Sequence, residues 1–312
     1  MRISTPDIWS NALNNLTQAQ VAQQTASDQV STQKIATDLE GYGSSSEVIA
    51  AYQSTLARTN GYVSVTQTVS NRLTSQDLAL TTTSGAASSA KDAIMSSLSS
   101  NDGTSLILGL QGAFSAALNG LNYQYNGQYL FGGGNDNTPP VSVTSLSQLG
   151  AMSASTAATV FVNGSVKKTS TVGPNTTVTT GMLASDLGKN MMQTFQDIQK
   201  YNDDPATGPF GNPLTAAQQQ FLTTKSQELT TEYNALVEQT SLNGTNQNTV
   251  TNTQTSLQSQ ADSMTTLIGN KTDADMATAY SNLQQAQQAV TASAQILAGL
   301  KTDSLLNILP VG

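Results

Sequence analysis

The sequence predicts a mainly α protein: a long antiparallel helical bundle or coiled coil formed by the N- and C-terminal halves, with a small central β domain. Both ends of the 312-residue chain carry apolar residues at heptad spacing, a pattern typical of helices that pack along their length. Residues 139–181 instead carry short β-prone runs separated by Gly, Pro and Asn, which is typical of strands and turns. We therefore expect the two ends to pack together while the middle loops out.

The first predicted helix runs from Ile8 to about Leu39, where apolar residues recur at spacings of three, four or seven. Many of these residues are alanines, so the apolar stripe is weak and the helix alone would be marginal in water. We expect it to be ordered by a partner helix. Residues 41–46 then break the helix, and Ser46 is a suitable N-cap for the next one.

The second predicted helix has the strongest pattern in the chain. Ile49, Leu56 and Val63 are seven residues apart, and the register continues to Leu98 over about seven heptads, which indicates coiled-coil packing. Residues 101–103, Asn-Asp-Gly, predict its end. A third helix follows over about 105–125, and the short connection predicts that it runs antiparallel to the second.

The middle of the chain contains the β signals. Residues 126–140 predict a turn, a short strand and a second turn. Asn163-Gly164 separates the β-prone runs 160–162 and 165–167, a sequence typical of a type I′ hairpin. Residues 173–175, Gly-Pro-Asn, predict a further turn.

The C-terminal half predicts helices again, beginning with one from Leu183 to Tyr201 and a loop over residues 203–213. Apolar residues then repeat every seven positions in two series, Leu222, Leu229, Leu236 and Val250, Leu257, Met264. Asn243-Gly244 between the series predicts a turn, and Gly269-Asn270 predicts a break.

The last predicted helix reaches almost to the C-terminus. Its stripe is formed by Met276, Leu283, Val290 and Leu297, with a companion frame of Tyr280, Ala294 and Ile308. A terminal helix that stays this apolar implies a partner, because unsupported chain ends usually fray. That partner is either the N-terminal helix or a neighbouring subunit.

The pattern divides the chain into three parts. Residues 1–42 and 272–312 form the terminal helices. Residues 43–138 and 182–271 form a helical bundle domain, and residues 139–181 form a small β insert.

The composition argues against several classes of function. Only 10% of residues are charged, against a typical ~25%. With 12 Lys and Arg and a net charge of −8, the chain offers no basic surface for nucleic acid or for an anionic membrane. Cys and His are absent, which removes thiol nucleophiles, imidazole bases and the usual zinc ligands. We expect no enzyme activity, no catalytic residue, no cofactor and no metal site.

The few motifs that suggest chemistry have simpler interpretations. The run 132–134, Gly-Gly-Gly, lacks the Lys-Ser/Thr of a phosphate-binding loop and predicts a sharp turn. Asp273 and Asp275 are two residues apart, so a helix would place them on different faces. They are better explained as acids at a helix N-terminus. Trp9, the only Trp, is expected to be buried in a helix contact.

The N-terminus lacks the apolar segment of a cleaved secretory signal. No run approaches the ~20 apolar residues of a membrane span. We therefore expect a cytosolic protein, or one exported by a route that leaves no cleaved signal.

Several segments resemble the bacterial flagellin and hook-associated protein family, in matching order along the chain. They are Met1-Arg2-Ile3-Ser4-Thr5, Ser31-Thr32-Gln33-Lys34, Asn126-Gly127-Gln128-Tyr129-Leu130-Phe131-Gly132-Gly133, and Thr272-Asp273-Ala274-Asp275 with the Gln/Ala-rich helix ending Ser304-Leu305-Leu306. The third, similar to an Asn-Gly-x-Tyr-x-Phe-x-Gly segment, is the most specific.

The chain departs from the family at three places. Gln33 replaces the glycine of a Ser-Thr-Gly-Lys stretch, and residues 38–43 replace an acidic-Pro segment. The opening also lacks the Asn-Thr-Asn usual in flagellin. This last departure favours a junction protein, with a divergent flagellin that polymerises into the filament as the alternative.

The resemblance implies a structural subunit of the bacterial flagellum that joins hook to filament. It also implies unfolded export through the type III apparatus without a cleaved signal, an extracellular location and a role in motility. The implied partners are hook-associated protein 1, flagellin, further copies of the chain in a helical ring, and an export chaperone on the C-terminal helix.

The resemblance also implies that the terminal helices, residues 1–42 and 272–312, pair as an inner assembly domain, so the expected assembly or chaperone surface lies on them. It comprises Leu13, Leu16, Val30, Tyr280, Leu283, Val290, Leu297 and Ile308. A different class of function, a secreted helical adhesin or binding module, has the same polar, weakly charged composition. Such a module would not require mobile terminal helices in the free protein.

Overall fold

The computed structural model describes residues 5–153 and 159–302, and most of them are helical, which confirms the predicted mainly α class. The chain forms two compact units, residues 1–59 with 259–312 and residues 60–258. Both divisions fall inside the two longest helices, α2 (Ser46–Ser100) and α6 (Ala216–Thr272). No helix in the described ranges has an apolar stretch long enough to cross a bilayer.

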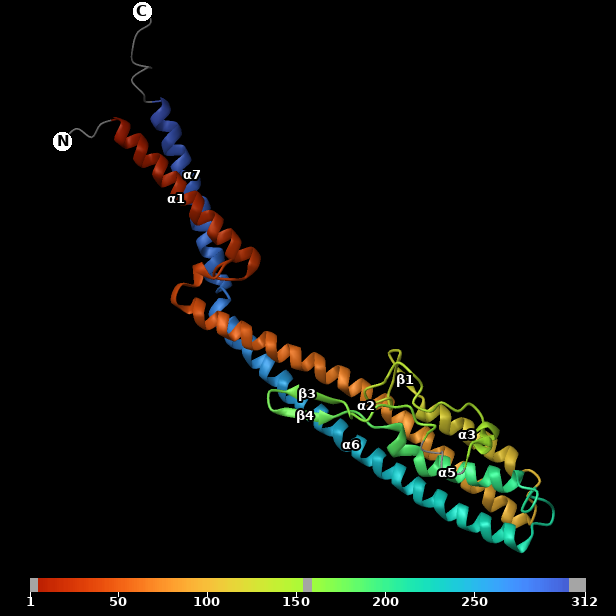
Figure 1. The fold of residues 1–312 in the computed structure, drawn as a ribbon. Helices are drawn as coiled ribbons and strands as arrows, with labels where there is room; N and C mark the ends of the chain where they lie inside the picture. Colours follow the sequence, from red (N-terminus) through yellow and green to blue (C-terminus); the bar gives the residue numbers. More distant parts are fainter. Residues whose placement is uncertain (1–4, 154–158, 303–312) are drawn as a thin grey trace, which may run out of the picture. The chain divides into compact units, whose positions relative to one another are not determined.

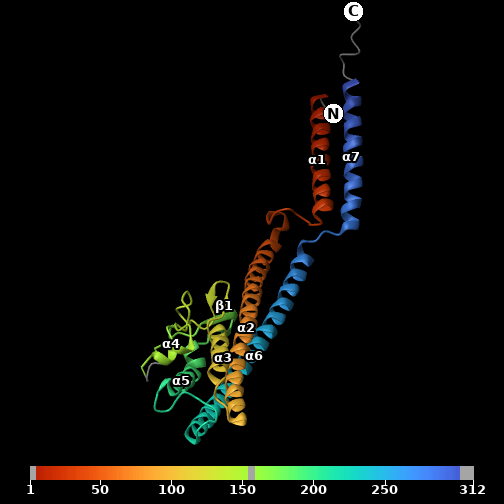
Figure 2. The same cartoon turned by 90° about the vertical axis from the view of Figure 1, so that its right-hand side faces the viewer.

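The first unit is built around α1 (Thr5–Thr32) and α7 (Met276–Thr302). The two helices lie side by side and run in opposite directions, as both views show (Figures 1 and 2). A short 3-10 helix (Glu40–Ser45) leads into the first turns of α2. The unit therefore joins segments from opposite ends of the sequence, as the shared heptad pattern predicts.

The second unit is a bundle in which α2 and α6 run antiparallel. Two hydrogen bonds mark the direction: Gln254 Nε2 donates to Gln67 Oε1 of α2 at 3.0 Å, and Gln219 Nε2 donates to Oδ1 of Asn101, directly after α2, at 2.9 Å. The helices α3 (Leu106–Leu121) and α5 (Ala184–Asp203) pack with them (Figure 2), and α4 (Leu146–Ala151) lies against α5.

Two hairpins complete the second unit. β1 (Gln124–Tyr125) and β2 (Gln128–Tyr129) pair antiparallel around Asn126 and Gly127, whose φ angles are 50° and 77°. β3 (Thr169–Gly173) and β4 (Thr176–Thr179) pair antiparallel with an irregular register at the turn (Figure 1).

The hairpin predicted at Asn163-Gly164 is wrong. The Asn163 side chain instead accepts a hydrogen bond from the backbone N of Ser185 at 3.1 Å, and Gly164 N donates to the carbonyl of Gly132 at 2.9 Å. These tertiary bonds hold the two residues in place of a local turn. The hairpin that does form has its turn at residues 174–175, within the Gly-Pro-Asn sequence 173–175, which confirms the turn predicted there.

The turn predicted at Asn243-Gly244 and the break predicted at Gly269-Asn270 are also wrong, because α6 is continuous through both. Leu236 and Val250, seven residues to either side of Asn243, are 1% and 0% exposed. Burial of the heptad series on both sides outweighs the local turn preference. At the other end of the chain, α1 ends at Thr32, earlier than the predicted Leu39.

Candidate functional site: the paired terminal helices

The contact between α1 and α7 is lined mainly by small residues. Alanines recur every seven positions and are at most 9% exposed, namely Ala12, Ala19 and Ala26 on α1 and Ala279 and Ala286 on α7. Alanine side chains allow two helix backbones to approach closely, and each contributes little apolar area. The pair is therefore closely packed but weakly stabilised.

Larger side chains alternate with the alanines and are half-buried. They include five residues of the predicted surface: Leu16, Val30, Leu283, Val290 and Leu297. Trp9 is half-buried in the same frame of α1. On α7 the companion frame is formed by Ala279 and Ala286; the predicted companions Tyr280 and Ala294 are exposed. That part of the register was wrong by one position: Ala279, Ala286 and Ser293 form the companion frame, because the close contact between the helices selects small residues over Tyr280.

One end of the pair is closed by backbone and ionic contacts. Ile35 N donates to the carbonyl of Thr272 at 2.8 Å, and Ala274 N donates to the carbonyl of Gln33 at 3.0 Å. Between these bonds Lys34 forms an ion pair with Asp273 and holds the pKa of that exposed carboxyl below its usual range. Asp275 Oδ1 accepts from the backbone N of Ala277 at 2.9 Å, which confirms its place at a helix N-terminus.

Gln33, which stands where the similar family has glycine, ends α1 in a left-handed conformation with φ 60°. Its backbone N donates to the carbonyl of Gln29 at 2.9 Å, the αL capping motif in which glycine is preferred. We expect Gln33→Gly to raise the free energy of unfolding by up to about 1 kcal/mol, because it removes the strain of a side chain at positive φ. Thermal unfolding followed by circular dichroism measures the change.

Gln20→Gly is the matched control, because Gln20 is exposed in the interior of α1. It should lower stability by about 0.5–1 kcal/mol, the cost of glycine within a helix. Equal losses of unfolding free energy in Gln33→Gly and Gln20→Gly would mean that Gln33 is not strained at the end of α1.

Away from their mutual contact the two helices expose large apolar side chains, and we call this exposed surface the outer face. Their exposed fractions are 40% for Ile8, 53% for Leu13, 61% for Val21, 56% for Tyr280 and 60% for Ile296. From residue 8 to 27 and from 276 to 300 neither helix has a charged residue. The pair thus presents an uncharged surface with isolated apolar side chains, which suits contact with another apolar surface.

A shallow cleft of about 300 Å³ lies where α1 and α7 meet. Its lining includes Ile8, Asn15 and Ala12 of α1 and Ile296 and Leu300 of α7. Leu13 and Tyr280 of the predicted surface lie outside the helix contact, among the exposed side chains. Ile308 lies outside the described residues.

The sequence pattern missed Ile8, Val21 and Ile296 as exposed apolar residues of this face. The available signal was that Val21 and Ile296 lie away from the heptad positions of their helices. The interface role of the predicted surface is untested by this geometry and stays a prediction.

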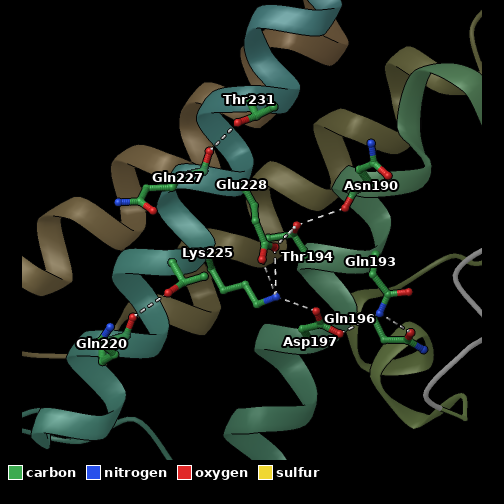
Figure 3. A network of polar contacts seen from close by, with 11 residues as sticks. Asn190, Gln193, Thr194, Gln196, Asp197, Gln220, Lys225, Gln227, Glu228 and Thr231 are labelled. Carbon is green, nitrogen blue, oxygen red and sulfur yellow. Dashed lines mark hydrogen bonds and ion pairs between the residues drawn. The ribbon is translucent and has the colours of Figure 1, made fainter.

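A polar site between α5 and α6 is the strongest alternative candidate for a binding or catalytic site. Lys225 is 9% exposed and lies between two carboxylates, with its Nζ 2.7 Å from Asp197 Oδ2 and 3.0 Å from Glu228 Oε2 (Figure 3). The Thr194 hydroxyl donates to Glu228 Oε2 at 2.9 Å. These residues line an open pocket of about 370 Å³ with Asn190 and Glu232.

The charges in this pocket are arranged to hold the two helices together. Burial lowers the pKa of Lys225, but its hydrogen bonds to Asp197 and Glu228 outweigh burial and raise it above the usual value. A lysine held protonated in this way is a poor nucleophile or base. Within residues 5–153 and 159–302 no three acidic side chains cluster so that they could hold a metal ion.

Glu232 is 6% exposed, and burial raises its pKa despite a hydrogen bond with Asn190. A carboxyl whose pKa is higher in the folded protein favours folding when protonated, and that contribution is lost as the pH rises through the folded pKa. We therefore expect Glu232→Gln to raise the free energy of unfolding at pH 7 by about 0.5–2 kcal/mol. At a pH below the pKa of the Glu232 carboxyl in the unfolded chain, this gain in unfolding free energy should vanish.

Urea unfolding of both proteins between pH 3.5 and 7.5 tests this expectation. Glu238→Gln is the matched control, because Glu238 is exposed on the same helix. A gain in unfolding free energy for Glu232→Gln that does not change with pH would contradict a raised pKa for the Glu232 carboxyl.

Comparison with known proteins establishes the fold. No protein-family model matches the sequence, and no curated protein matches it. Two solved structures are similar across most of the chain. A protein described as a flagellar hook-associated protein of Vibrio parahaemolyticus has a TM-score of 0.59 at 14% identity, covering 73% of this chain and 97% of its own. FlgL of Bacillus cereus has a TM-score of 0.53 at 14% identity, covering 71% and 98%.

Proposed function

We propose that this chain, which shares its fold with flagellar hook-associated proteins, is a structural subunit of the bacterial flagellum. The observation that carries the proposal is the outer face of the α1–α7 pair, where Val21 and Ile296 are 61% and 60% exposed. Exposed apolar side chains on a weakly stabilised helix pair are expected where the pair is completed by neighbouring subunits.

The near absence of charge supports contact between identical copies. Like charges repel when copies of one helix pair pack in a ring, and residues 8–27 and 276–300 have none to repel. A heterologous contact, in which one patch meets a different patch of the next copy, builds such a ring or an open helical stack. The terminal helices thus serve as the assembly elements.

The specific role that we propose is that of hook-associated protein 3, at the junction between hook and filament. The neighbours would then be hook-associated protein 1, flagellin and further copies of the chain. The divergent-flagellin alternative places the same helix pair inside the filament. Export through the type III apparatus, an extracellular location and capture of the α7 region by an export chaperone complete the proposal.

Co-sedimentation with isolated hook seeds tests the proposal. We expect the double variant Val21→Ser, Ile296→Ser to lose at least tenfold in seed binding, because it removes two exposed apolar contacts, and to keep the helix content of the wild type. Leu108→Ser is the matched control: Leu108 is 73% exposed, but on the second unit. It should bind seeds as the wild type does.

Two outcomes would contradict the proposed role at the hook–filament junction. Equal seed binding by the double variant and the wild type would remove the α1–α7 face as the assembly surface and favour a helical binding module. Elongation into filaments by the purified chain on its own seeds would favour the flagellin alternative.

A further inference from the structure

A polar layer interrupts the otherwise apolar series along α6. Every seventh residue from Leu222 to Leu257 is at most 3% exposed, in the order Leu222, Leu229, Leu236, Asn243, Val250, Leu257. Asn243 is the only polar member of the series and is 0% exposed. Its Nδ2 donates to the backbone carbonyl of Leu73 on α2 at 2.9 Å.

This layer satisfies only part of its hydrogen-bonding capacity. Gln247 Nε2 donates to the same Leu73 carbonyl at 3.1 Å, one turn further along α6. On α2, Gln76 is 1% exposed and follows Leu73 by one turn. Among the described residues, Gln76 Oε1 and Asn243 Oδ1 are buried without a hydrogen-bond partner. Unpaired buried acceptors weaken the contact between two helices at the level where they lie.

The apolar core of the second unit separates into two clusters at this level. The larger cluster begins at Ala79 and Leu80 on α2 and reaches Leu236 on α6. The smaller cluster joins α2, α6 and the β3–β4 hairpin through Val69, Leu73, Val172, Val178 and Val250. Gln76 lies between the clusters along α2, and Asn243 lies between them along α6.

A buried polar side chain does not by itself create such a boundary. Thr83, also on α2, is 0% exposed, but its hydroxyl donates to the carbonyl of Ala79 at 2.8 Å within the same helix. It leaves no buried acceptor unpaired and lies beside residues of the larger cluster. The layer of Gln76, Asn243 and Gln247, which we term the amide layer, differs because it combines unpaired acceptors with a gap in the apolar contacts.

We propose that the amide layer is the boundary of a separately opening segment in the second unit. This clip segment consists of β3–β4 with residues 60–73 of α2 and 247–258 of α6. It opens while the larger cluster stays folded, and opening uncovers Val69, Leu73 and Val250. One polar contact between the hairpin and α6 is the bond from Asn246 Nδ2 to the Thr179 carbonyl at 3.2 Å. This proposal is independent of the flagellar role.

Native-state hydrogen exchange of the full chain in low urea, read by mass spectrometry, tests the proposal. In the wild type, peptides from the clip segment should exchange at least tenfold faster than peptides covering 84–97 and 187–199, with a smaller dependence on urea. In Asn243→Leu the apolar series becomes continuous. The clip peptides should then slow by at least tenfold and approach the urea dependence of the larger cluster.

Asn248→Leu is the matched control, because Asn248 is exposed on the same stretch of α6. It should leave the difference between the two groups of peptides unchanged. Gln76→Leu is a second test from the opposite helix and should also slow the clip peptides. A single urea dependence for all peptides of the wild type overturns the proposal. So does an undiminished difference in both Asn243→Leu and Gln76→Leu.

Discussion

Phe195→Ala is expected to lower the free energy of unfolding of the second unit by about 3–5 kcal/mol, the cost of removing a large side chain from a packed core. Phe195 lies on α5 and is 0% exposed. Its ring packs edge-to-face with that of Phe114 on α3, with centroids 5.5 Å apart and planes at 84°. Loss of this aromatic contact adds about 0.5–1.5 kcal/mol to the loss of buried area. Urea unfolding followed by circular dichroism gives the change.

Leu108→Ala provides the surface control for that measurement, since Leu108 is 73% exposed on α3. It should change stability by no more than about 0.5 kcal/mol. A loss below about 1 kcal/mol for Phe195→Ala would mean that α3 and α5 do not share the core described here.

Ala26→Leu is expected to separate α1 from α7. Ala26 is 4% exposed and lies in the contact between the two helices. A leucine there cannot fit without pushing the helices apart, at a cost of about 1–3 kcal/mol. Because the contact is formed largely by alanines, this cost should be enough to open it. An isolated helix of this length is marginal in water, so both helices should lose helical circular dichroism.

The same substitution at Ala22 is the matched control, because Ala22 is exposed on α1. Ala22→Leu should keep the helical signal of the wild type. Retention of full helix content and of seed binding by Ala26→Leu would contradict the close contact between α1 and α7.

Periodicity predicted the elements whose burial is itself periodic. The spacing of Leu187, Met191, Phe195 and Ile198 predicted the inward face of α5, and all four are at most 3% exposed. The alternation of alanines and larger residues likewise placed Leu16 and Val30 on the inner stripe of α1. In both helices the spacing of apolar side chains identifies the buried face directly, so the sequence is sufficient to predict that face.

Local turn sequences gave wrong predictions where residues distant in the chain form hydrogen bonds with the residues of the expected turn. Asn163-Gly164 has the sequence of a hairpin turn, but hydrogen bonds to Ser185 and Gly132 fix it elsewhere. Asn243-Gly244 has the sequence of a turn, but Asn243 bonds to the carbonyl of Leu73, 170 residues away. The exposed face of α1 and α7 was only partly predictable for a related reason. The position of Val21 outside the heptad frame indicates exposure on the helix, but which surface the pair leaves open depends on where the neighbouring helix packs.

Hydrogen exchange of α1 and α7 in the purified chain, alone and mixed with hook or filament seeds, tests the central claim most directly. If the helix pair is an assembly element, amides of residues 5–32 and 276–302 should exchange faster than those of the bundle in the free protein. They should gain at least tenfold protection on seeds, while residues 84–97 remain unchanged. Terminal helices that are as protected as the bundle in the free protein, with no change on either seed, would contradict the account.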